Sequence, residues 1–154
     1  SDSGEDMLTG LQDIELSNIS LFIDDTSTSN SCSFSRANLK GANLFGAELT
    51  GVSFYDSNLT GANLSNAELA NASMYMTNLS DANLVSSDLN GAYLFMADLT
   101  GANLTHAGLY NANLTGANLT GANLTGATYL NTFCPDGTKN IGSSPCTTKQ
   151  LIPT

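Results

Sequence analysis

Residues 112–126 read ANLTGANLTGANLTG, which is one five-residue unit repeated three times in a row. Each unit has leucine at its centre, alanine two positions before it and glycine two positions after it. Moving outward in both directions, the same alternation of a small and a large residue runs without an insertion from residue 32 to residue 131. Twenty consecutive units of this kind indicate a repeat architecture rather than a conventional globular core.

A period of five matches neither the 3.6-residue period of a helix nor the strict alternation of a strand. Each unit therefore predicts a short extended piece followed by a bend. The leucine and the alanine two positions before it share one face and point inward, while the residue between them points outward. Glycine or asparagine ends most units, where a corner needs permissive backbone angles. We expect a chain that turns every five residues around a narrow apolar interior.

The number of units in one coil follows from the exceptions to leucine. Phe34, Phe54 and Met74 occupy central positions at intervals of twenty residues. An aromatic series next to these positions keeps the same interval: Tyr55, Tyr75 and Phe95. Twenty residues per coil means four sides. Residues twenty apart then stack at the spacing of neighbouring strands, about 4.8 Å, so five coils would form a rod roughly 24 Å long.

The tandem A(N/D)LXX pattern of residues 32–131 resembles the pentapeptide-repeat family. The resemblance implies an all-β solenoid, a right-handed quadrilateral parallel β-helix with four pentapeptides per coil, about five coils and short capping segments. Many members of the family come from cyanobacteria and chloroplasts, and some are exported to the periplasm or the thylakoid lumen. The resemblance says little about function, because one fold hosts many roles.

The segments outside the repeats are expected to cap the solenoid, since a bare end exposes unpaired backbone groups. Residues 1–31 predict an N-terminal cap with a short helix and degenerate repeats. Residues 132–154 predict a C-terminal cap stapled by a disulfide between Cys134 and Cys146. A reduced pair in a cytosolic protein is the alternative. Cys32 stands where alanine usually stands and reads as a small buried residue.

Charge and hydropathy exclude some functions and favour one location. The net charge of −10 disfavours binding to nucleic acid. No run of about 20 apolar residues is present, so no insertion into a membrane is expected. The chain starts at Ser1 rather than at methionine. Together with the disulfide, this start predicts a processed protein outside the cytoplasm, in the periplasm, in the thylakoid lumen or secreted.

The outward residues sort into ladders, one on each side of the square. Side one comprises the units centred on residues 34, 54, 74, 94 and 114, and sides two, three and four follow in chain order. Side one holds an apolar strip, which is the candidate interaction surface: Tyr55, Tyr75, Phe95, Tyr93, Met76 and Met96. The alternative is that these side chains stack on one another to stiffen the wall, or lie under a terminal segment.

Two other ladders are polar. On side three, one column consists of asparagines whose amides can bond up and down the stack, which predicts a structural role: Asn43, Asn63, Asn83, Asn103 and Asn123. On side four, an acidic ladder comprises Glu48, Glu68 and Asp88. Like charges about 5 Å apart repel modestly through water. This ladder is read as a solvated face, or as a site for a weak cation or a basic partner.

No catalytic constellation is recognisable, because nothing in the sequence would hold the lone His106 beside a nucleophile and the interior is expected to be filled by leucine and alanine. No cofactor or metal is implied. We expect a non-enzymatic interaction or scaffold module with an unknown protein partner, acting as a monomer or as an end-to-end dimer.

Two other functions are weighed. The family's quinolone-resistance members suggest a DNA-mimicking inhibitor or protector of gyrase, a type II topoisomerase. Half of the 14 acidic residues precede residue 32, and the repeats hold six acidic residues against Arg36 and Lys40. The repeats therefore carry little of the negative charge that such mimicry needs. An ice- or surface-binding solenoid would use the threonines of side two, but Ser80 and Lys40 interrupt that column.

Overall fold

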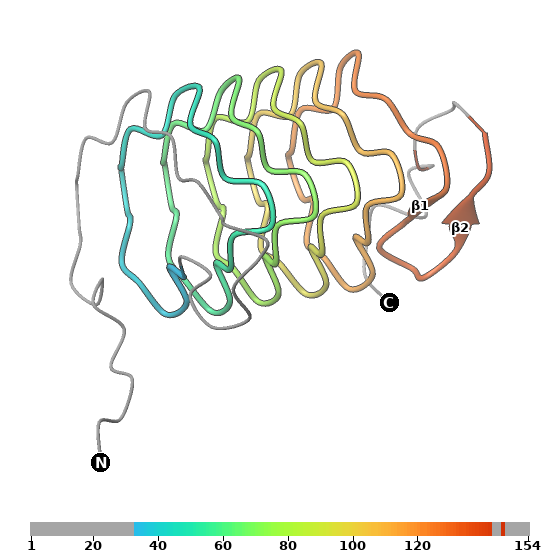
Figure 1. Cartoon of the computed structure of the whole chain (residues 1–154). Helices are drawn as coiled ribbons and strands as arrows, with labels where there is room; N and C mark the ends of the chain where they lie inside the picture. Colours follow the sequence, from blue (N-terminus) through green and yellow to red (C-terminus); the bar gives the residue numbers. More distant parts are fainter. Residues whose placement is uncertain (1–32, 143–145, 147–154) are drawn as a thin grey trace, which may run out of the picture.

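The computed structural model describes residues 33–142 and Cys146. The coils stack one behind another into a short rod, from the blue N-terminal coils to the orange C-terminal ones (Figure 1). The N-terminal cap expected over residues 1–31, with its short helix, lies outside the described residues, as does Cys32. The shape of the rod follows from the backbone pairing between coils.

Parallel bridges join residues twenty apart along the rod, which confirms the predicted four-sided coil. On one side they run from Asn38 to Asn58 and on to Asn78. The N–H of Leu39 donates to the carbonyl of Asn58 at 2.7 Å, and the N–H of Asn58 donates to the carbonyl of Ala37 at 2.9 Å. Each coil is thus the hydrogen-bond partner of the next. The described residues form no helix, so this part of the chain contains no helix that is long and apolar enough to cross a membrane.

The interior is apolar and built from two inward positions per unit. All central leucines from Leu39 to Leu114 have no solvent exposure, and the rings of Phe34 and Phe54 stack with centroids 5.2 Å apart. Small residues at the other inward position leave room for central residues from four sides to meet. Where that small residue is polar, its hydroxyl is satisfied, as when the Thr77 Oγ1 donates to the Phe54 carbonyl at 2.6 Å.

The corners are β-turns whose second turn residue has a left-handed backbone. The N–H of Ala42 donates to the carbonyl of Leu39 at 3.0 Å, and Gly41 between them has a φ of 69°. Asparagine side chains support the same turns: the Asn58 Oδ1 accepts bonds from the Thr60 N–H at 3.0 Å and from its hydroxyl at 2.7 Å. The repeated Asn-Leu-Thr triplets therefore serve the corners.

The ladder continues beyond residue 131, where the repeats were expected to end. Phe133 pairs in parallel with Asn113, and the buried Thr132 donates its hydroxyl to the Leu109 carbonyl. The chain then leaves the coil, and β1 (Thr132–Phe133) pairs antiparallel with β2 (Lys139–Asn140). One further unit thus begins before the hairpin ends the solenoid.

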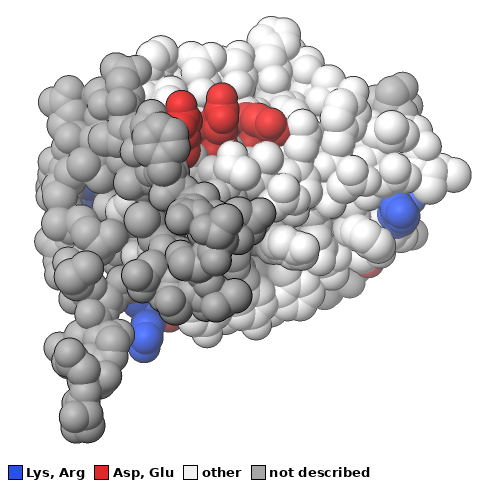
Figure 2. Space-filling view, viewed as in Figure 1, with Lys and Arg blue, Asp and Glu red and all other residues white. Residues whose placement is uncertain are grey.

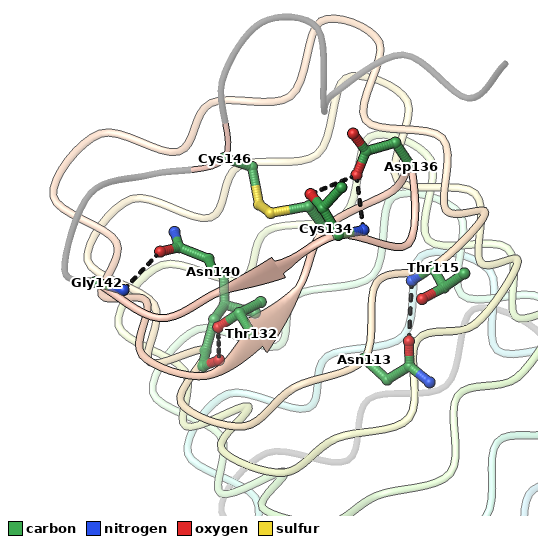
Figure 3. Close-up of a disulfide and its surroundings, with 10 residues drawn as sticks. Asn113, Thr115, Thr132, Cys134, Asp136, Asn140, Gly142 and Cys146 are labelled. Atoms are coloured by element: carbon green, nitrogen blue, oxygen red, sulfur yellow. Dashed lines mark hydrogen bonds between the residues drawn. A yellow bond between two sulfur atoms is a disulfide. The ribbon is translucent and has the colours of Figure 1, made fainter.

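The disulfide between Cys134 and Cys146 is formed, as the sequence predicts. Their Cα atoms lie 5.9 Å apart, and both residues are buried. Cys134 stands where the central residue of the next coil would stand, so the bond ties the chain after β2 to the end of the apolar interior (Figure 3).

Tyr129 occupies the central position in the last coil of side four. Its ring is almost fully buried, next to the partly buried Leu124 at the end of the core. Its hydroxyl has no hydrogen-bond partner, the one such buried side-chain group in the described part of the chain. Burial raises the pKa of Tyr129 to about 12, so the phenol is neutral at physiological pH.

Candidate interaction surface

The aromatic ladder of side one is a continuous stack. The rings of Tyr55 and Tyr75 lie 5.5 Å apart and 4° from parallel, and those of Tyr75 and Phe95 lie 5.4 Å apart and 12° from parallel. Such pairs add about 0.5–1.5 kcal/mol each beyond the burial of area. The rings therefore stack on one another along the wall. Tyr55 nevertheless stays 40% exposed at one end of the stack.

Met76 and Met96 are held in a costly backbone conformation. Their φ angles are 57° and 58°, at the turn position that glycine, asparagine or aspartate takes in most other units. A left-handed backbone costs an ordinary residue roughly 1–2 kcal/mol. Their side chains are 44% and 52% exposed, so burial recovers only part of that cost. Arg36, Ser86 and His106 have the same left-handed backbone at other corners, so what distinguishes the two methionines is the exposed apolar side chain on that backbone.

Tyr93 and Phe133 extend the same surface. Tyr93 lies in the middle of side one and is 56% exposed. Phe133 follows it two coils later, and the Lys139 Nζ lies 5.6 Å from the centre of its ring. The sequence reading missed Phe133, although counting twenty residues on from Asn113 would have placed it in the column.

The two polar ladders also form. The Asn63 Nδ2 donates to the Asn43 Oδ1, and the Asn83 Nδ2 to the Asn63 Oδ1, at 3.3 Å each. These bonds between coils agree with the structural role predicted for the column.

The acidic ladder of Glu48, Glu68 and Asp88 is bridged coil to coil and is visible as a red row in Figure 2. Part of the Asp88 carboxylate is used locally, because its Oδ1 accepts the Asn90 N–H at 2.9 Å. No three His, Cys, Asp or Glu residues within 33–142 converge as metal ligands.

The fold and surface define a class of protein: a four-sided β-solenoid whose side one carries five of the nine large apolar side chains that are exposed in the described part of the chain. The model of the family described as pentapeptide repeats matches eight copies over residues 32–69, 62–95 and 97–128. The chain belongs to the pentapeptide repeat family, and its fold is the right-handed quadrilateral β-helix of that family. No curated protein matches the sequence.

Several solved structures are similar. A pentapeptide repeat protein from the thylakoid lumen of Arabidopsis thaliana is 31% identical, with 71% of this chain and 64% of that chain covered and a TM-score of 0.48. The present chain thus spans less than two thirds of that protein's length.

Two cyanobacterial proteins are also similar. HetL from Nostoc sp. strain PCC 7120, a pentapeptide repeat protein involved in heterocyst differentiation regulation, is 25% identical, with 84% and 72% covered and a TM-score of 0.47. Rfr23 from Cyanothece 51142 is 30% identical, with 78% and 87% covered and a TM-score of 0.38.

Proposed function

We propose that this pentapeptide repeat protein is a non-enzymatic interaction or scaffold module that binds a protein through the apolar strip of side one. The observation that carries the proposal is the placement of Met76 and Met96, two exposed thioethers on strained backbone beside a stacked aromatic ladder. Glycine or asparagine at these positions would relieve the backbone strain and still form the same corner. Flexible, polarizable methionine side chains suit a contact surface that must adapt to a partner.

A non-catalytic role is supported by the filling of the solenoid. Leucine and alanine occupy the interior of the described coils, so a substrate would find its binding groups only on the outer walls. Those walls present threonine and serine hydroxyls that are engaged in the corners by asparagine amides and aspartate carboxylates, as when the Thr100 hydroxyl donates to the Asp98 Oδ1.

A location outside the cytoplasm is supported by the disulfide. Protein disulfides form and persist in oxidising compartments and are rare in reducing ones. The bond between Cys134 and Cys146 ties down the C-terminal end of the solenoid, and it is buried. We therefore place the protein in the periplasm, in the thylakoid lumen or among secreted proteins.

Replacing Met76 and Met96 together by asparagine is expected to change stability and binding in opposite directions. Asparagine tolerates a left-handed backbone, so the free energy of unfolding should rise by about 1 kcal/mol. Loss of the thioethers should reduce capture of a partner at least tenfold when the protein is used as bait in an extract of its own cells. Urea unfolding and quantitative pull-down measure the two effects.

The matched control is Ser86→Asn, which relieves a left-handed residue with a φ of 56° on another side of the rod. This variant should be stabilised without losing capture. Equal capture by the wild type and the double methionine variant would remove side one as the binding surface.

A further inference from the structure

The middle column of side one changes from small to large side chains along the rod. Its first three members are serines and its last three are bulkier: Ser33, Ser53, Ser73, Tyr93, Asn113 and Phe133. The parallel bridges place successive members on successive coils. Tyr93 and Phe133 protrude, at 56% and 38% exposure. In this column the N-terminal half is therefore low and the C-terminal half is raised.

The turn column beside it carries opposite charges at its two ends. Its members are Arg36, Asp56, Met76, Met96, Gly116 and Asp136. The Gly116 N–H donates to the Pro135 carbonyl at 2.8 Å, so the chain is still in register as it reaches Asp136. Arg36 is exposed, and the carboxylate of Asp136 also supports a turn by accepting the Thr138 N–H. In this column the cation lies at the N-terminal end and the anion at the C-terminal end. Lys139, whose Nζ lies 5.6 Å from the centre of the Phe133 ring, adds a second cation near the C-terminal end of the face.

We propose that the partner on side one is a second copy of this chain, packed antiparallel about a two-fold axis that runs parallel to the strands. This inference rests on the proposed function, because it names the occupant of the same surface. An isologous axis makes one patch complementary to itself. With the axis in this direction, every column of side one faces the same column of the second copy in reverse order.

An axis between the coils of Ser73 and Tyr93 matches each raised side chain to a low one. Tyr93 faces Ser73 of the second copy, and Phe133 faces Ser33. In the adjoining columns, Met76 faces Met96 and Tyr75 faces Phe95. These contacts enclose the apolar strip in the centre of the interface and leave polar groups at its rim, which is the usual anatomy of a protein contact.

The charges select this register over its neighbours. With the axis between the two coils, Arg36 of one copy faces Asp136 of the other, twice over. A shift by one coil toward the C-terminal end sets Asp56 against Asp136, two like charges. A shift by one coil toward the N-terminal end sets Arg36 against Gly116 and loses both ion pairs. Complementary charges at a rim fix register and suppress wrong pairings.

A parallel arrangement lacks these matches. An axis along the rod would place each coil against the same coil, so that Tyr93 meets Tyr93 and Phe133 meets Phe133, while the serines would face each other across a gap. End-to-end pairing at the C-terminal end would have to displace the β1–β2 hairpin and the disulfide that ties it down. One side of a short rod is a small interface, so we expect a dimer that depends on protein concentration.

Two single-cysteine variants test the register, Ser53→Cys and Asn113→Cys, each in a Cys32→Ser background that keeps the native disulfide. The two positions face each other across the proposed axis. Two copies of position 53 are offset by three coil spacings, or about 14 Å. A bismaleimide with a two-carbon spacer, added to concentrated protein, should therefore link the mixed variants and leave either variant alone mostly unlinked, with at least a fivefold difference in yield. Circular dichroism confirms that each variant is folded.

The outcomes are distinct. Cross-linking confined to the mixture, together with sedimentation of the wild type as a concentration-dependent dimer, supports the antiparallel contact. Cross-linking of Ser53→Cys alone, a dimer without a cross-link in the mixture, or a monomer at millimolar concentration overturns it. Any of these three results leaves the proposed function standing if capture of a different protein still depends on Met76 and Met96, and removes both proposals if it does not.

Discussion

The variant Phe54→Ala is expected to lose about 3–5 kcal/mol of the free energy of unfolding, the range for deletion of a buried aromatic ring. Phe54 has no solvent exposure and stacks on Phe34 inside the tube. The surrounding coils are tied to one another by backbone bonds at fixed spacing, so the walls cannot collapse into the space that the ring leaves. Urea unfolding followed by circular dichroism measures the loss.

The neighbouring Tyr55→Ala is the matched control. Its ring is removed from the outer wall, where it stacks on Tyr75 and is 40% exposed, so a loss of about 1 kcal/mol is expected. The contrast separates the interior from the surface at two consecutive residues. Similar losses for both variants would show that the aromatic ladder is as structural as the core.

The variant Cys146→Ala is expected to lose about 3 kcal/mol, because the disulfide closes a loop with a sequence separation of 12 residues. Cys134 would stay in place as a small buried residue in line with the apolar interior. The loss should appear first at the C-terminal coil, because each coil of a solenoid contacts only its neighbours. Differential scanning calorimetry and hydrogen exchange of the last coil measure the effect.

Reduction supplies the control for this variant. In urea unfolding experiments, dithiothreitol should lower the free energy of unfolding of the wild type to that of Cys146→Ala. The free energy of unfolding of the variant should not change. If reduction destabilises both proteins equally, or neither, the disulfide is not what holds the C-terminal end.

The four-sided coil could be predicted from the sequence because the side-chain pattern and the backbone pairing have the same period of twenty residues. Phe34, Phe54 and Met74 recur every twenty residues, and the structure bridges residues twenty apart. The stacking of Tyr55 on Tyr75 then follows directly. The disulfide could also be predicted, since its two cysteines lie in a short segment after the repeats. Each of these features depends on spacing alone.

What the sequence did not predict depends on three-dimensional detail. The repeats were predicted to end at residue 131, but Phe133 still pairs in parallel with Asn113. The strain at Met76 could not be recognised without the φ angle of that turn position. The lone hydroxyl of Tyr129 depends on which atoms close the end of the core. The N-terminal cap stays a prediction.

The apolar strip, the left-handed methionines and the change in side-chain size along side one suggest that different parts of the rod have different roles. The leucine interior and the ladders of asparagine set the shape, and large apolar residues replace small polar ones at more positions on side one than on any other side. Tyr93 replaces a serine or an asparagine in its column, and Met76 and Met96 replace glycine or aspartate in theirs. These departures from a repeat that otherwise favours small polar residues are the reason why we propose this side as the contact surface.

Site-specific photo-cross-linking tests that central claim most directly. A benzophenone amino acid is placed at Tyr93 on side one, or at Tyr110 on side four, which is a comparably exposed tyrosine at 42%. The protein is irradiated in its own cells, and adducts are identified by mass. The account predicts abundant adducts from position 93, to a second copy or to another protein, and few from position 110. Equal yields from the two positions, or none from position 93, would contradict it.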